Sequence, residues 1–130
     1  MTQLEALLTY LHEVRGSDLH LKPGTVPHVR VDGQLRPTPF EAPPPGMVEG
    51  LAMEILDASR QAELAEHGEA GAGLSVPGVG RFRVAVHRQR GSLAMVVRRV
   101  PPEIPDLDEL GLPPQVERFA EETKGLLLIT

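Results

Sequence analysis

The 130-residue sequence contains no cysteine and no tryptophan, and its aromatic content is only 3%. Without cysteine the chain can form no disulfide, hold no thiolate-bound metal and use no cysteine nucleophile. Because aromatic side chains are so few, leucine, valine, isoleucine and alanine must fill the interior. The hydrophobic content of 41% is sufficient for a core, and the length suits one domain rather than two.

The chain also lacks a long apolar run and a basic N-terminal segment. No stretch approaches the ~20 apolar residues that a membrane-spanning helix needs. Met1-Thr2-Gln3 precedes the first leucine without a positive charge, so no signal peptide is predicted. We therefore expect no direct membrane insertion, and the absence of cysteine suits the reducing cytoplasm.

Positive charge is scarce overall but concentrated in one segment. The net charge is -5 at pH 7, which argues against general nucleic-acid binding. Six of the 13 lysine and arginine residues nevertheless lie between Arg81 and Arg99, a stretch without aspartate or glutamate. A cationic patch on an acidic protein indicates a local partner of negative charge.

Residue patterns in the first half predict a helix and three strands. Leucines at positions 4, 7, 8 and 11 repeat with helical spacing, so a helix is expected between Thr2 and Gly16. Residues 18–22 alternate polar and apolar side chains, which predicts a half-buried strand with its two leucines inward. Residues 28–31 predict a second strand, and Asp32-Gly33 is typical of a hairpin turn into a third.

The middle of the sequence predicts loops and two helices. Five prolines between positions 37 and 46 exclude regular structure there. Apolar residues at helical spacing predict a helix over residues 47–56, and residues 59–66 predict a second, shorter one. We interpret residues 68–73 as a loop and residues 74–76 as a short strand.

Residues 81–87 and 93–100 predict the clearest hairpin of the chain, because apolar and polar side chains alternate in both. If Arg90-Gly91 forms a two-residue turn, Val84 faces Val97. The apolar side chains of the two strands then share one face, which supports this register.

The same register places Arg83 directly opposite Arg98, where like charges repel. A four-residue turn would pair Arg81 with Arg98 instead, on the same face. Either way at least two guanidinium groups converge, and an anion such as phosphate would relieve the repulsion. The alternative is a solvated face whose carboxylate neighbours are supplied by the fold.

Histidines raise the question of a metal or acid–base site. His20 and His28 lie on neighbouring predicted strands near Asp18, but no metal-ligand spacing such as H-E-x-x-H occurs, so no metal site is predicted. Asp18 and His20 share one strand face. They could brace a turn or an interface, or act as an acid–base pair if a substrate lay nearby.

Prolines at positions 101, 102 and 105 indicate a domain boundary. We expect a first domain over residues 1–103 and a linker over residues 104–124 that contains a short helix at about 114–121. Residues 125–130 read as the start of a buried parallel strand, and such a strand normally leads into a loop or helix that carries chemistry. We therefore expect the chain to be the front of a larger protein.

Five short motifs occur in an order and at a spacing typical of one family. They are G-S-D-L-H-L from residue 16, V-R-V-D-G from 29, V-P-G-V-G-R-F-R-V from 76, E-L-G-L-P from 109 and K-G-L-L-L-I-T from 124. Through these motifs nearly the whole chain resembles the PilT family of type IV pilus retraction ATPases, a branch of the type II/IV secretion ATPases.

The resemblance implies an α+β fold, in which a PAS-like N-terminal domain packs helices on an antiparallel sheet. In the family, the strand that matches residues 125–130 is the first of a RecA-like domain and leads into a Walker A loop, which cradles phosphates. This chain contains neither Walker A nor Walker B. We therefore expect no hydrolysis by the fragment and no cofactor of its own, while ATP and Mg²⁺ are implied for the parent protein.

Family members are homo-hexameric motors for twitching motility, which work in the cytoplasm at the inner face of the membrane through an inner-membrane platform protein. The resemblance implies that arginines of the N-terminal sheet reach the γ-phosphate in a neighbouring subunit. By position, the candidates are Arg83 and Arg98, with Arg81 as runner-up. Further residues match family motifs or the interface: Ser17, Asp18, His20, Arg30, Asp32 and Gly33.

The sequence departs from the family at two places. Gly16 stands where alanine is usual, and residues 70–74 replace an acidic-aromatic segment, which puts the strand there in doubt. Two alternatives remain open. One is a stand-alone PAS-like interaction or sensor module, and the other is the N-terminal domain of a related type II secretion or pilus extension ATPase.

Overall fold

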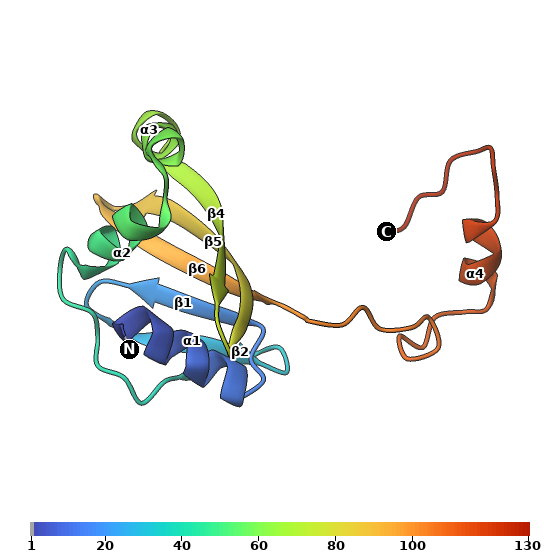
Figure 1. Ribbon diagram of the computed structural model, residues 1–130, viewed down its shortest axis with the longest axis horizontal. Coiled ribbons are helices and arrows are strands. Elements are labelled where there is room, and N and C mark those ends of the chain that lie inside the picture. Colours follow the sequence, from blue (N-terminus) through green and yellow to red (C-terminus); the bar gives the residue numbers. More distant parts are fainter. Residues whose placement is uncertain (1) are drawn as a thin grey trace.

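The computed structural model describes residues 2–130, in which helices cover one face of an antiparallel sheet (Figure 1). Within these residues the sheet has six strands in the order β3-β2-β1-β6-β5-β4. Every pair of neighbouring strands is antiparallel. The predicted α+β fold with an antiparallel sheet is therefore confirmed.

The N-terminal elements agree with the sequence pattern. Helix α1 spans Gln3–Glu13, and Thr2 caps it through reciprocal hydrogen bonds with Glu5. The three strands that follow are β1 Asp18–Lys22, β2 Thr25–Val31 and β3 Gln34–Pro37. Asp32 and Gly33 have φ values of 49° and 79°, as a two-residue turn between β2 and β3 requires.

The two predicted helices of the middle segment are present, but the predicted loop at residues 68–73 is wrong. Helix α2 spans Met47–Ile55 and helix α3 spans Ala58–His67. Strand β4 spans Glu69–Val76 and pairs with β5 along its whole length. The glycines of β4 lower its intrinsic strand preference, but the backbone hydrogen bonds to β5 and the burial of Ala70 outweigh that effect.

The predicted hairpin forms in the predicted register. Strand β5 spans Gly80–Gln89 and strand β6 spans Ser92–Val100. Arg90 and Gly91 make the two-residue turn with φ values of 51° and 81°. Arg81 faces Val100 rather than an arginine, which excludes the four-residue turn.

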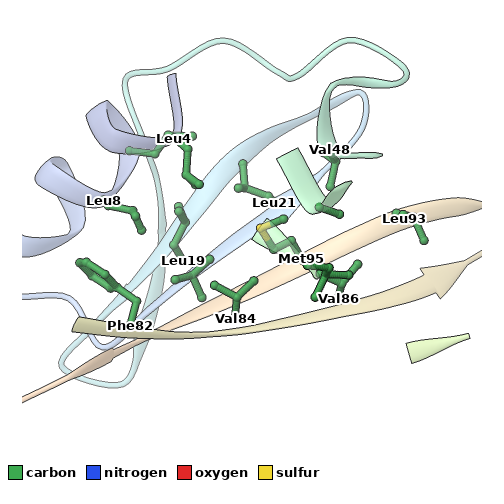
Figure 2. Close-up of a cluster of buried hydrophobic side chains, with 14 of the residues drawn as sticks. Leu4, Leu8, Leu19, Leu21, Val48, Phe82, Val84, Val86, Leu93 and Met95 are labelled. Atoms are coloured by element: carbon green, nitrogen blue, oxygen red, sulfur yellow. The ribbon is translucent and has the colours of Figure 1, made fainter. Parts of the chain in front are cut away.

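One apolar core lies between the helices and a single face of the sheet. Figure 2 shows Leu4 and Leu8 of α1 directed toward Leu19 of β1 and Phe82 of β5. Leu8 and Leu19 have no exposed surface, and Phe82 is 2% exposed. Because side chains alternate along each strand, the polar residues between them lie on the opposite sheet face.

Residues 101–130 extend away from the sheet (Figure 1) and contain helix α4, Gln115–Ala120, where a short helix was predicted. Residues 125–130 form no strand within the described chain, and Leu126 and Ile129 are 85% and 86% exposed. A strand forms only beside a hydrogen-bonded neighbour, so the strand over residues 125–130 stays a prediction. The domain limits at residues 103 and 124 stay predictions as well. No helix within residues 2–130 is long and apolar enough to cross a membrane.

Candidate functional site

Four charged residues line up across the central strands on the face opposite the core. Arg83 on β5 is the cross-strand partner of Arg98 on β6. Asp18 on β1 is the partner of both Arg98 and Arg30, the latter on β2. We call these four residues the charged row. The predicted convergence of Arg83 and Arg98 is thus confirmed, and a carboxylate lies beside it.

Asp18 is almost fully buried, with 6% of its surface exposed. Its Oδ2 accepts a hydrogen bond from Ser17 Oγ at 2.7 Å, and its Oδ1 accepts one from Arg98 Nε at 2.9 Å. Arg30 Nε lies 3.8 Å from Oδ2. A carboxylate can remain charged at such burial because hydrogen bonds and opposite charges surround it.

These contacts determine the ionisation of Asp18. Burial raises the pKa of the carboxyl group, but the hydrogen bonds from Ser17 and Arg98, with the charge of Arg98, more than reverse this effect. The pKa of Asp18 therefore lies below its ordinary value of 3.8. At neutral pH the charged row holds three positive charges and one negative charge, and three minus one leaves a net charge of +2.

The two facing arginines differ in how they are held. Arg98 uses Nε for Asp18, yet its side chain is 72% exposed. Its terminal amino groups take no hydrogen-bond partner among residues 2–130. The exposed Arg83 side chain makes neither a hydrogen bond nor an ion pair in the described chain. The row therefore offers unused guanidinium donors, which suits an anionic ligand.

A surface depression lies beside both arginines. Arg83, Arg98 and Val96 line it on the sheet, and Arg60 lines it at the start of α3. Gly73 of β4 is the cross-strand partner of Arg83 and has no side chain to cover it. An oxyanion can therefore approach the Arg83 guanidinium from the side of β4.

His20 and His28 are cross-strand partners, as their neighbouring strands predicted. His28 Nδ1 lies 2.7 Å from the carbonyl oxygen of Val26. His20 Nε2 is buried and has no hydrogen-bond partner within residues 2–130. Burial lowers the pKa of His20 below 6.5, although Asp18 acts in the opposite direction. Across the described residues no group of three or more metal-ligating side chains is brought together.

The remaining predicted residues lie apart from the unused donors. Arg81 lines a different groove, together with Arg99 and residues of the segment after β6. Arg30 Nη1 donates a hydrogen bond to the carbonyl oxygen of Gly33 at 2.9 Å, so Arg30 also braces the β2–β3 turn. Asp32 is the other residue of this turn.

The sequence interpretation did not pair Asp18 with the arginines. Asp18 and Arg98 are 80 positions apart. They meet only because β1 lies between β2 and β6 in the sheet. The one signal in the sequence is that Asp18 occupies an outward position of an alternating strand, which shows its face but not its neighbour.

Comparison with known proteins gives relatives among pilus motors, although no protein-family model matches the chain. The chain is 32% identical over 126 residues to the type IV pilus ATPase PilU of Pseudomonas aeruginosa. It is also 32% identical over 124 residues to the type IV pilus retraction ATPase PilT of that organism. The matches cover 97% and 95% of this chain but only 33% and 36% of the relatives.

A solved structure agrees with these relatives. The crystal structure of the pilus retraction motor PilT with bound ADP superimposes with a TM-score of 0.77 at 35% identity, over 94% of this chain and 36% of that one. Over nearly its whole length the chain is similar to the N-terminal region of the PilT/PilU type IV pilus ATPases. The predicted family resemblance is therefore confirmed.

The chain spans about a third of the length of these relatives and matches the N-terminal region of PilT. The ATPase DotB of Legionella pneumophila has the same fold, with a TM-score of 0.66 at 17% identity over 94% of this chain and 35% of that one. In this chain, the charged row is where unused guanidinium groups meet on the sheet face opposite the core.

Proposed function

We propose that this chain is the N-terminal region of a hexameric, ATP-driven pilus retraction motor, and that Arg83 and Arg98 contact the nucleotide of a neighbouring subunit. The observation that carries the proposal is the cross-strand pair itself. Two arginines face each other beside a depression, and their free donors have no partner among the described residues. The relatives named as pilus ATPases supply the context.

The chemistry of phosphoryl transfer fits such a pair. Negative charge is spread over the γ-phosphoryl oxygens as the terminal phosphate leaves, and a guanidinium can bind two of these oxygens at once. The net charge of the charged row is +2 at neutral pH. In the proposal ATP and Mg²⁺ are bound by the motor region of the longer protein, and this segment supplies positive charge from outside that site.

The same proposal includes a cellular location and a binding partner. The hexamer acts in the cytoplasm at the inner face of the membrane and transmits force through an inner-membrane platform protein. The coding sequence after Thr130 is expected to continue into G-x-x-x-x-G-K-[ST], the phosphate-binding loop of such a motor. An unrelated continuation would contradict the motor function.

Alanine substitution in the full-length hexamer tests the arginines. Arg83→Ala and Arg98→Ala are each expected to lower ATP turnover, on the order of 10³-fold for an arginine that stabilises transition-state charge. Size-exclusion chromatography should show intact hexamers. Arg36→Ala removes an exposed arginine of β3 outside the charged row and is the matched control. Unchanged turnover in both row variants, with the hexamer intact, would refute the assignment.

A stand-alone interaction module is the second candidate. Its support is that the whole core cluster lies between Leu4 and Val97, so residues 101–130 add nothing to it. This candidate predicts that a chain ending near Val100 keeps the stability and the partner binding of the complete sequence. The sequence after Thr130 distinguishes the candidates, because only the motor requires a phosphate-binding loop there.

A further inference from the structure

We propose that Asp18 is a positioning residue for Arg98: it holds the Nε edge of the guanidinium and thereby turns the two terminal amino groups toward the phosphate. This inference rests on the proposed function, because it assigns the way in which one of the two arginines is presented. Asp18 itself does not touch the nucleotide in this scheme.

The two edges of the Arg98 guanidinium have different surroundings. A guanidinium has one edge formed by Nε with a terminal nitrogen and another formed by both terminal nitrogens. Arg98 Nε donates to Asp18 Oδ1 at 2.9 Å. The terminal amino groups have no hydrogen-bond partner in residues 2–130, and the side chain is 72% exposed. One edge is therefore fixed, and the other remains available.

Asp18 is itself fixed, which is what a positioning group needs. It is 6% exposed, and its Oδ2 accepts a hydrogen bond from Ser17 Oγ at 2.7 Å. Arg30 approaches the same oxygen from β2 at 3.8 Å. The carboxylate thus has little freedom to follow a moving guanidinium, and holding Arg98 before the ligand arrives lowers the conformational entropy lost on binding.

Arg83 lacks such a holder. Its cross-strand neighbours are Arg98 and Gly73, and neither offers an acceptor side chain. The proposed pair is therefore asymmetric, with Arg98 pre-positioned and Arg83 mobile before the anion binds. The carboxylate also weakens the repulsion between the two arginines, because it stands on the far side of Arg98.

The first experiment measures steady-state ATP hydrolysis by the full-length hexamer carrying Asp18→Asn. The asparagine keeps the shape and one acceptor but loses the charge. We expect kcat to fall about tenfold to 10²-fold, as for a misplaced catalytic group, with a much smaller change in KM for ATP. Unchanged or increased kcat would overturn the proposal, since an increase would mean that Asp18 competes with the phosphate for Arg98.

A double-mutant cycle separates positioning from general stabilisation. If Asp18 acts through Arg98, adding Asp18→Asn to Arg98→Ala should cost no further activity. Equal losses in both backgrounds would show a merely structural role and overturn the inference. Arg98→Lys should not restore turnover, because one ammonium group cannot present the two edges of a guanidinium.

A measurement on the 130-residue chain needs no motor activity and covers the case in which a variant hexamer fails to assemble. The Arg98 ¹⁵Nε–¹Hε group should be ordered by NMR relaxation in the wild-type chain and mobile in Asp18→Ala, which has no acceptor at this position, while the fold seen in backbone spectra is kept. A mobile Arg98 Nε in the wild-type chain would overturn the positioning role. If Arg98 is ordered and Arg83→Ala and Arg98→Ala leave turnover unchanged, it is instead the proposed function that fails.

Discussion

Asp18 and Arg98 are 80 positions apart in the sequence and directly opposite each other in the sheet, joined by a 2.9 Å hydrogen bond from Arg98 Nε to Asp18 Oδ1. The contact joins the first strand of the domain to the last. It also makes Arg98 different from Arg83, the other arginine of the facing pair, because Arg83 has no acidic neighbour across the strands.

The buried carboxylate of Asp18 predicts a loss of stability in acid. Because the pKa of Asp18 is below 3.8 in the folded chain, the unfolded state binds more protons as the pH falls. The contribution of Asp18 to the free energy of unfolding is therefore fully present at pH values above 3.8, the ordinary pKa. It disappears as the pH falls through the lower pKa of the folded state. Urea denaturation of wild type and Asp18→Asn between pH 7 and pH 2 should show the two stabilities converging in acid. A constant difference would contradict this account.

His20 predicts a separate effect at higher pH. Its pKa lies below 6.5 in the folded chain, so the unfolded chain takes up a proton first as the pH decreases. Stability should therefore fall as the pH drops from about 6.5, the ordinary value, toward the folded-state pKa. In His20→Gln this part of the pH dependence should be missing. Denaturation curves with the same slope against pH for both proteins would show that His20 is not responsible.

The close approach around Gly16 predicts that alanine destabilises this chain. A Cβ built there would lie 2.6 Å from Leu11 Cδ1 and 3.1 Å from the carbonyl oxygen of Arg30. Leu11 is fully buried and has little room to move, so Gly16→Ala should cost about 1–3 kcal/mol of unfolding free energy. Calorimetry or urea denaturation measures this cost, and Tm equal to that of wild type would contradict the packing argument.

Gly73 is the matched control, since a Cβ there would meet nothing within 4 Å. It lies in the extended backbone of β4, where glycine costs conformational entropy that alanine does not. Gly73→Ala is therefore expected to raise the free energy of unfolding by about 0.5–1 kcal/mol. A decrease would mean that β4 needs backbone freedom at this position.

The core predicts a large effect from a single truncation. Leu19 has no exposed surface and lies between α1 and the centre of the sheet (Figure 2). Leu19→Ala should lower the free energy of unfolding by about 2–5 kcal/mol, because the cavity left behind cannot close. Leu35→Ala, at a leucine that is 51% exposed on β3, should change it by less than about 0.5 kcal/mol. Similar losses in both variants would contradict the assigned core.

Several elements could be predicted from the sequence because their causes are local. The leucine repeat and the Thr2 cap specify α1, and Asp32-Gly33 specifies the turn between β2 and β3. The β5–β6 register follows from Arg90-Gly91 and from keeping the apolar residues on one face, and it places Arg83 opposite Arg98. Side-chain alternation and turn type depend on only a few neighbouring residues, so the register of one hairpin can be derived from the sequence.

Strand β4 and the partner of Arg98 could not be predicted in this way. The glycines of β4 give no strand signal of their own, and the strand exists because β5 offers a row of backbone donors and acceptors. Asp18 reaches Arg98 because β1 lies between β2 and β6, an order set by how helices α1, α2 and α3 pack on one face of the sheet. The sequence by itself thus determined the helices, the β2–β3 and β5–β6 hairpins and the facing arginines. Only the tertiary structure decided which carboxylate stands beside them, because contacts between distant segments depend on the packing of the whole domain.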